Sequence, residues 1–149
     1  MQRRNLIAAG AGVVMASAMT AYAGTADDAA VVKMLDEFAA AWNRHDVDGL
    51  MACMADDCVF EATAGPDVAG TRHVGREAVR TAYAAIFETY KDGRWNNPHH
   101  FVAGNRAVSE WTFTGTTNAG AKVEVNGCDV FTLRGTKIVV KNSYRKQRS

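Results

Sequence analysis

The strongest pattern in the chain is an apolar stripe at helical spacing. Between Asp27 and Arg44, the residues Val31, Leu35, Phe38 and Trp42 recur at intervals of three or four positions. Residues at this spacing lie on one face of an α-helix. The stripe therefore predicts a long amphipathic helix that buries this face.

Two further stretches have helical character. Asp46 is a suitable N-cap for a short helix that ends at Asp56-Asp57. Gly75-Arg76-Glu77 opens a third helix, which runs to about Tyr90 before Lys91-Asp92-Gly93 ends it. Three helices are therefore expected, the first of them the longest.

The remaining stretches are rich in β-branched and aromatic residues, which is typical of strands. Strands are expected at Cys58–Ala62, near 99–103, over about 107–114, and in a closing hairpin from Val123 to Tyr144. Short turns join the late strands, so those neighbours are antiparallel. The predicted order is α-α-β-α-β-β-β-β.

This order indicates an α+β fold. A curved antiparallel sheet wraps around the long N-terminal helix, because helices on one face of such a sheet bury both apolar surfaces. The result is a cone with an open mouth, where small-molecule sites tend to occur. The chain has 149 residues, 48% of them hydrophobic, and residues 24–149 are expected to form one domain.

The first 23 residues have the features of an export signal. Arg3 and Arg4 precede a mildly apolar stretch from Leu6 to Met19, and Ala21-Tyr22-Ala23 fits a cleavage site. The paired arginines also fit a twin-arginine signal, and a general secretory leader stays open. We expect a periplasmic or secreted protein with no membrane attachment after cleavage.

Charge argues against a nucleic-acid partner. The formal net charge is +1, and removing Arg3 and Arg4 leaves 15 basic against 16 acidic residues. A nearly neutral domain has no electrostatic reason to bind nucleic acid. The sequence contains no metal-binding or phosphate-loop motif, so neither a metal nor another cofactor is expected. The expected roles of Cys53, Cys58 and Cys128 are those of small buried hydrophobic residues.

Asp129 is the residue that points most directly to function. Strand alternation places it on one face with Val125, Phe131 and Leu133. A carboxyl group on an apolar face is costly unless it is paired, protonated or used. Asp129 is therefore either a functional acid or a buried structural carboxylate.

The hairpin register decides what faces Asp129, and two registers are open. A two-residue turn at Gly135-Thr136 pairs Asp129 with Asn142 and places Tyr144 nearby as a second polar partner. A three-residue loop instead places Lys141 opposite Asp129, as an ion pair that would lower the pKa of the carboxyl group. The first register keeps one face apolar and is preferred.

Several segments carry a resemblance to a known family. They are 38–61, Gly75–Arg80, Ser109–Gly115 and Gly127–Phe131. The chain resembles the SnoaL-like and ketosteroid isomerase-like branch of the nuclear transport factor 2-like superfamily over nearly all of residues 24–149. The resemblance implies the cone-shaped fold and a homodimer formed through the outer face of the sheet. The fold hosts isomerases, cyclases, dehydratases and binding proteins, so it does not specify a reaction.

The ketosteroid isomerases use an Asp base, a Tyr and a protonated Asp that donates to an oxyanion. By resemblance, Asp129 takes the place of the protonated acid. Phe38 stands where the tyrosine is expected, and it has no hydroxyl group. The base aligns with about Ala62, which leaves Glu61 as the nearest acid. Related dehydratases use a histidine in this cavity, which makes His100 the other candidate base.

The sequence therefore predicts a cofactor-independent isomerase or lyase acting on a small hydrophobic carbonyl compound by general acid/base chemistry. The alternatives are a binding protein that holds a lipophilic ligand without converting it, and a scaffold that dimerises through its sheet. Residues expected at the site are the catalytic candidates Asp129, His100 and Glu61 and the lining residues Phe38, Trp42, Trp111, Phe131, Asn142 and Tyr144.

Overall fold

The computed structural model describes residues 26–148, which contain three helices and six strands. The helices are α1 (Ala26–Arg44), α2 (Val47–Cys53) and α3 (Arg76–Thr89). The strands are β1 (Met54–Glu61), β2 (Arg72–Val74), β3 (Arg94–Ala103), β4 (Arg106–Thr116), β5 (Lys122–Arg134) and β6 (Lys137–Arg145). The predicted signal segment 1–23 lies outside this range and stays a prediction.

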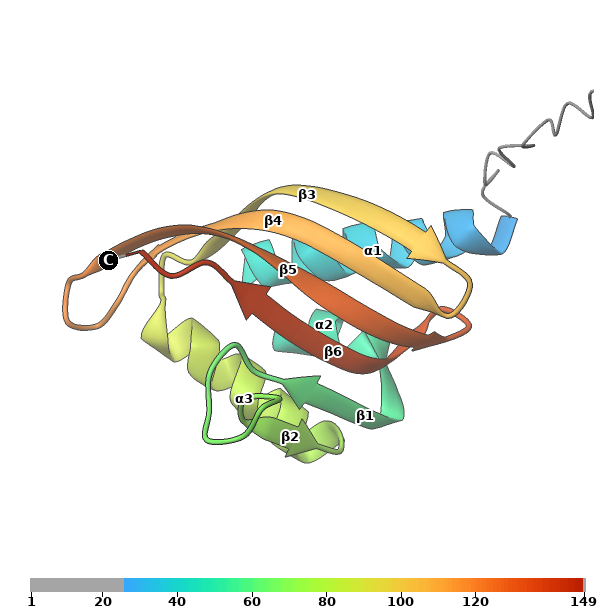
Figure 1. Cartoon of the computed structure of the whole chain (residues 1–149), viewed down its shortest axis with the longest axis horizontal. Helices are drawn as coiled ribbons and strands as arrows, with labels where there is room; N and C mark the ends of the chain where they lie inside the picture. The colour runs from blue at the N-terminus through green and yellow to red at the C-terminus, as the bar shows by residue number, and fades with distance from the viewer. Residues whose placement is uncertain (1–25, 149) are drawn as a thin grey trace, which may run out of the picture.

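All six strands belong to one sheet in the order β2-β1-β6-β5-β4-β3. Its long strands curve across α1 and α2, which lie behind them, while α3 lies beside β1 and β2 (Figure 1). The predicted α+β class with a curved sheet is confirmed. Several details differ: a three-residue strand, β2, lies between β1 and α3, β1 begins at Met54 directly after α2, and β1 is parallel to β6.

The apolar stripe of α1 forms the centre of the core, as its spacing predicts. Leu35, Phe38 and Trp42 are all buried. The Phe38 ring packs edge-on against Trp42 and against Phe131 of β5, with centroid separations of 6.0 Å in both cases. Tyr83 of α3 completes this cluster, at 4.8 Å from Trp42. Helix α1 therefore packs against both the inner face of the sheet and α3.

The β5–β6 hairpin contains the feature that departs most from expectation. Its turn is the predicted two-residue one, since Arg134 pairs with Lys137. Thr132 then pairs with Val140, which leaves Val139 as an extra residue in a β-bulge. Beyond the bulge each residue of β5 meets a partner one position later than in a regular hairpin.

The preferred register is therefore wrong for the strand segment that contains Asp129. Asp129 pairs with Ser143 instead of Asn142. Because side chains alternate along a strand, a shift of one position exchanges the two faces. Lys141 and Ser143 are buried on the inner side, and Tyr144 is exposed on the outer side.

Within residues 26–148, no helix is long and apolar enough to cross a membrane.

Candidate functional site

A buried ion pair lies on the inner face of the sheet, where β5 and β6 meet. The Nζ of Lys141 is 2.7 Å from Oδ1 of Asp129 and 2.5 Å from Oγ of Ser143. The Ser143 hydroxyl donates to the same Asp129 oxygen at 2.6 Å. The Lys141 and Asp129 side chains are 5% and 7% exposed. Three side chains thus form a closed polar triangle in an apolar setting.

The second oxygen of Asp129 is occupied as well. Nε1 of Trp111 donates to Oδ2 at 3.0 Å. With Lys141, Ser143 and Trp111 all donating, the contacts of Asp129 are those of an ionised carboxylate, which only accepts hydrogen bonds. Asp129 faces inward as the sequence predicts. In this arrangement, however, it orients Lys141 and Trp111 and is not free to donate to a ligand.

Beside the triangle lies an aromatic pocket of about 200 Å³. Lys141 and Ser143 lie in its wall, and Arg145 borders it. The chain has three tryptophans, and all of them line this pocket. The apolar lining residues are Trp42, Phe60, Ala62, Ile86, Trp95, Trp111 and Phe113, with Thr63 and Tyr90 adding hydroxyl groups.

The Lys141 ammonium faces the aromatic walls of the pocket. Its Nζ lies 4.8 Å from the ring centroid of Phe60 and 5.4 Å from that of Trp42. An ammonium over a ring face at this range is attracted by the ring quadrupole. The pocket therefore combines one buried cation with a mostly aromatic surface.

Trp42 presents an unsatisfied donor in the same wall. Its Nε1 is buried and has no hydrogen-bond partner among the residues that the structure describes. An indole N–H can only donate, and a buried donor without an acceptor costs free energy. Trp42 thus has, behind the surface of the pocket wall, a donor for which an acceptor atom is missing.

His100 lies outside this pocket. Its Nδ1 is 2.6 Å from Oγ of Ser109, and its Nε2 is 3.3 Å from Oδ1 of Asp36 on α1, an ion-pair distance without hydrogen-bond geometry. Burial lowers the pKa of His100, and the nearby Asp36 carboxylate opposes this effect. The three residues resemble a catalytic triad in composition. Ser109 is buried, however, and neither it nor His100 lines the aromatic pocket.

Glu61, the other candidate base, also lies away from the pocket. It follows Phe60 on β1, and strand alternation sends the two side chains to opposite faces. Its carboxylate accepts a hydrogen bond from Nε of Arg72 on β2 at 3.2 Å. The structure thus brings neither expected base to the pocket.

The expected lining residues divide into three groups. Trp42 and Trp111 line the pocket. Phe38 and Phe131 are buried in the core and do not reach it. The bulge places Asn142 and Tyr144 on the outer face, where the Asn142 amide donates to the Tyr144 hydroxyl at 2.9 Å.

Sequence reasoning missed Lys141, Ser143 and Trp95 as site residues. Lys141 stands directly after Ile138-Val139-Val140, so its position in an apolar strand was a usable signal. Trp95 was overlooked because β3 begins at Arg94, five residues before the predicted start of this strand. The three-residue loop considered in the sequence analysis also brings Lys141 to Asp129, but by a longer turn. The structure does so by a bulge at Val139.

The cysteines contribute no reactive thiolate. Cys53 and Cys58 are buried, Cys128 is partly buried, and all three are free. Burial raises the pKa of each thiol, which suits the expected role as small hydrophobic residues. In the part of the chain that the structure describes, no three potential metal ligands lie close enough together to hold an ion.

Comparison with known proteins places this site in a family context. A family model for the SnoaL-like domain matches residues 35–141. No curated protein matches the chain well enough to count as a relative.

Solved structures with the same fold are numerous. One is a nuclear transport factor 2-like protein of unknown function from Mesorhizobium loti, with 27% identity and a TM-score of 0.69 over 84% of this chain and 98% of that one. Two others are provisionally named polyketide cyclases. The one from Xanthomonas campestris has 19% identity and a TM-score of 0.71, covering 79% of this chain and 91% of its own. The one from Jannaschia has 14% identity and a TM-score of 0.73, covering 83% and 90%.

Proposed function

Because the chain belongs to the SnoaL-like family of the nuclear transport factor 2-like superfamily, we propose that it binds a small lipophilic molecule in the aromatic pocket. The observation that carries this proposal is the buried Lys141 ammonium in a wall otherwise dominated by aromatic rings. Pockets of this kind, with a mostly apolar lining and a few polar groups that fix orientation, are typical small-molecule sites.

Binding is favoured over catalysis because the pocket lacks a free base. General acid/base catalysis needs a proton acceptor within hydrogen-bond reach of the ligand. His100 is held between Ser109 and Asp36, and Glu61 is paired with Arg72. The described residues that line the pocket include no carboxylate and no imidazole.

A cofactor-independent isomerase, lyase or cyclase is the second candidate. It is favoured by the position of Lys141, since an ammonium in a water-poor pocket can stabilise a developing enolate oxygen. The provisional names of two structural neighbours point the same way. In this case the substrate must be acidic enough to lose its proton to water, because no side chain in the pocket takes it.

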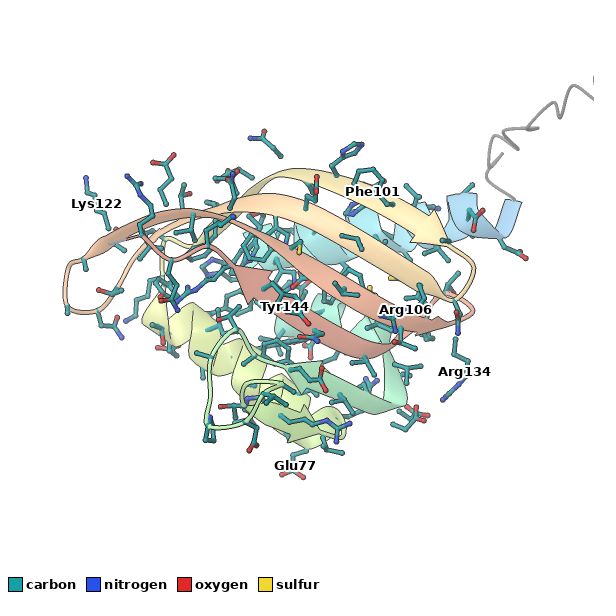
Figure 2. All side chains as sticks on the ribbon, viewed as in Figure 1. Glu77, Phe101, Arg106, Lys122, Arg134 and Tyr144 are labelled. Carbon is teal, nitrogen blue, oxygen red and sulfur yellow. The ribbon has the colours of Figure 1, made fainter. Side chains whose placement is uncertain are left out.

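A homodimer is part of the proposal. The outer face of the sheet carries Phe101 and Tyr144, which are 51% and 54% exposed. Figure 2 labels both on the sheet strands. Val108 and Val130 are paired with each other on this face, and Phe101 pairs with Val108. Exposed apolar area on a broad sheet face is a usual protein–protein surface. Export to the periplasm or the exterior, inferred from residues 1–23, completes the proposal.

The direct test is to purify the chain that begins at residue 24 and to identify by mass spectrometry what small molecule it carries. Wild-type protein is expected to retain a lipophilic compound that Trp111→Ala loses, because this change removes part of the pocket wall. Tyr144→Ala, which alters only the outer face, is the matched control and is expected to retain it. If wild type carries nothing and no lipophilic compound shifts the indole resonances, the proposal is wrong.

A further inference from the structure

We infer that the ligand of the aromatic pocket is an uncharged molecule with one aromatic ring and a carbonyl-type acceptor. This inference rests on the proposed binding function and specifies its ligand class. It follows from three properties of the pocket, namely its volume, its donors and its charge.

The volume of the pocket accommodates one ring. The pocket measures about 200 Å³, whereas pockets for drug-sized ligands measure about 300–1,000 Å³. A cavity of about 150 Å³ is known to hold benzene. A benzene ring with a short substituent therefore fits within the pocket, whereas a fused polycyclic skeleton would extend through its open side and leave apolar surface in water.

The polar atoms available to a ligand are mainly donors. A lysine ammonium has three N–H bonds, and Asp129 and Ser143 accept two of those of Lys141. The third is left for the ring faces of Trp42 and Phe60 or for a ligand atom. Nε1 of Trp42 is a second buried donor, without any partner in the described chain. The third N–H of Lys141 is therefore the donor next to the pocket space, and a ligand acceptor atom reaches Nε1 of Trp42 only when the indole ring turns toward it.

The charge of the site favours an uncharged acceptor. Lys141 and Asp129 have opposite charges 2.7 Å apart, so the pair has no net charge. A ligand carboxylate would lose its hydration and would still be repelled by Asp129. Arg145 at the border is exposed, and solvent screens its charge. A ketone or amide oxygen accepts the same hydrogen bonds without this cost.

The walls suit a ring. Trp95 lies 4.6 Å from Trp42 and 4.9 Å from Phe113 between centroids, with tilted planes. Aromatic rings pair well in tilted and edge-to-face arrangements. A ligand ring packed against these residues would add one more ring to an aromatic cluster that the protein already contains.

Four probes separate these properties. Acetophenone has one ring, one acceptor and no charge. Ethylbenzene lacks the acceptor, benzoate is charged, and 2-acetylnaphthalene has a second ring. Calorimetry on the wild-type chain is expected to show acetophenone binding about tenfold or more tighter than each of the others, since about 1.4 kcal/mol corresponds to tenfold. Shifts of the three indole N–H resonances locate the bound probe.

Two variants test the donors. Trp42→Phe removes the N–H together with one of the two fused rings, so both probes lose the same ring contact, and acetophenone affinity is expected to fall about five- to tenfold more than ethylbenzene affinity. The double variant Asp129→Asn with Lys141→Met removes both charges together, which avoids leaving one charge buried alone. It is expected to bind acetophenone no better than ethylbenzene. Lys122→Met, a change at the exposed start of β5, is the control and is expected to match wild type.

The outcomes are distinct. Equal or tighter binding of benzoate overturns the charge argument, and equal or tighter binding of 2-acetylnaphthalene overturns the size argument. If ethylbenzene equals acetophenone in the wild type, or if Trp42→Phe and the double variant keep the acetophenone preference, the donor argument is wrong. Failure of every probe to bind or to shift the indole resonances overturns this ligand class, whereas the proposed binding function fails only if the purified chain also carries no small molecule.

Discussion

At the scale of single residues, the main feature is a lysine that is buried without being isolated. Burying an ammonium alone would cost several kcal/mol. Lys141 avoids this through Asp129 and Ser143, and it faces the rings of Trp42 and Phe60. Asp129 is in turn satisfied by Trp111. The polar triangle is therefore stable as a unit and costly to break in part.

The first prediction is that Lys141→Met alone lowers the free energy of unfolding by about 3–5 kcal/mol, because it leaves the Asp129 carboxylate buried without its cation. Adding Asp129→Asn removes that charge and is expected to restore most of the loss. Urea unfolding measures both. Lys122→Met, at an exposed position, controls for the loss of a lysine. A single-variant loss below about 1 kcal/mol, the size typical of an exposed pair, would contradict the buried pair.

The second prediction concerns His100, whose pKa is lowered below its ordinary value of 6.5, first by burial. Below this ordinary value the unfolded chain binds a proton that the folded chain does not. Stability therefore decreases as pH falls from about 6.5 toward the folded pKa, where the decrease ends. Asp36 on α1 and His99 are the charged or titratable neighbours that act on it.

His100→Gln is expected to flatten this part of the stability profile, as measured by urea unfolding between about pH 7 and pH 5. His99→Gln, on the exposed neighbour, is expected to keep the slope. The pH range of this stability change is separate from the range in which the carboxylates act. The pKa values of Asp46, Asp57 and Asp92 are lowered from 3.8 by their hydrogen bonds. Their contribution is lost only below that value. An unchanged slope in His100→Gln would show that burial of this imidazole is not its source.

At the scale of elements, one side chain of α1 makes two hydrogen bonds to the backbone of the edge strand β3. Asn43, in the last turn of α1, accepts from the backbone N–H of Trp95 at 2.8 Å and donates to its carbonyl at 2.9 Å. Because β3 is an edge strand, these two bonds substitute for a neighbouring strand. They also hold the backbone of a residue that lines the pocket.

The third prediction is that Asn43→Ala lowers the free energy of unfolding by about 1–3 kcal/mol, because it leaves two partly buried backbone groups of Trp95 unsatisfied. Ligand affinity is expected to fall with it, since Trp95 loses its anchor. Asn118→Ala removes a single exposed bond to the Glu88 carbonyl and serves as the control, with little expected effect. Equal losses of unfolding free energy in the two variants would show that the hydrogen bonds of Asn43 to Trp95 contribute no more than one exposed hydrogen bond.

At the scale of the whole molecule, the curved sheet separates two surfaces. The inner surface holds the helices, the core and the pocket, and the outer surface has exposed apolar side chains (Figures 1 and 2). Exposed aromatic side chains such as Phe101 and Tyr144 on a broad sheet face are typical of a protein–protein surface. The two surfaces can therefore act separately, one in ligand binding and the other in association.

The fourth prediction is that the chain from residue 24 is a dimer in light scattering and that Phe101→Glu makes it a monomer by placing a charge in the apolar contact. Val68→Glu is the matched control, because Val68 is also an exposed apolar residue but lies in the loop between β1 and β2. It is expected to remain dimeric. A monomeric wild type, or dissociation by Val68→Glu as well, would remove the outer face from the proposal.

The sequence by itself determined the class of fold and the inward position of Asp129. Both depend on local periodicity, since Leu35, Phe38 and Trp42 recur at helical spacing and Asp129 alternates with Phe131. Each pattern extends over several residues, so an error of one or two residues at the end of an element does not change the prediction. Trp42 and Trp111, expected at the site as aromatic residues that could line a cavity, both lie in the pocket wall.

Only the tertiary structure decided which side chains meet Asp129. One extra residue at Val139 shifts the pairing and exchanges Asn142 for Ser143. Local pattern does not reveal such a bulge, because its position depends on the pairing of distant groups. Lys141 of β6 faces inward here because Asp129 of β5 accepts a hydrogen bond from its ammonium group. The His100 side chain lies against α1 and not in the pocket. Its partner there is Asp36, which stands more than sixty residues earlier in the sequence.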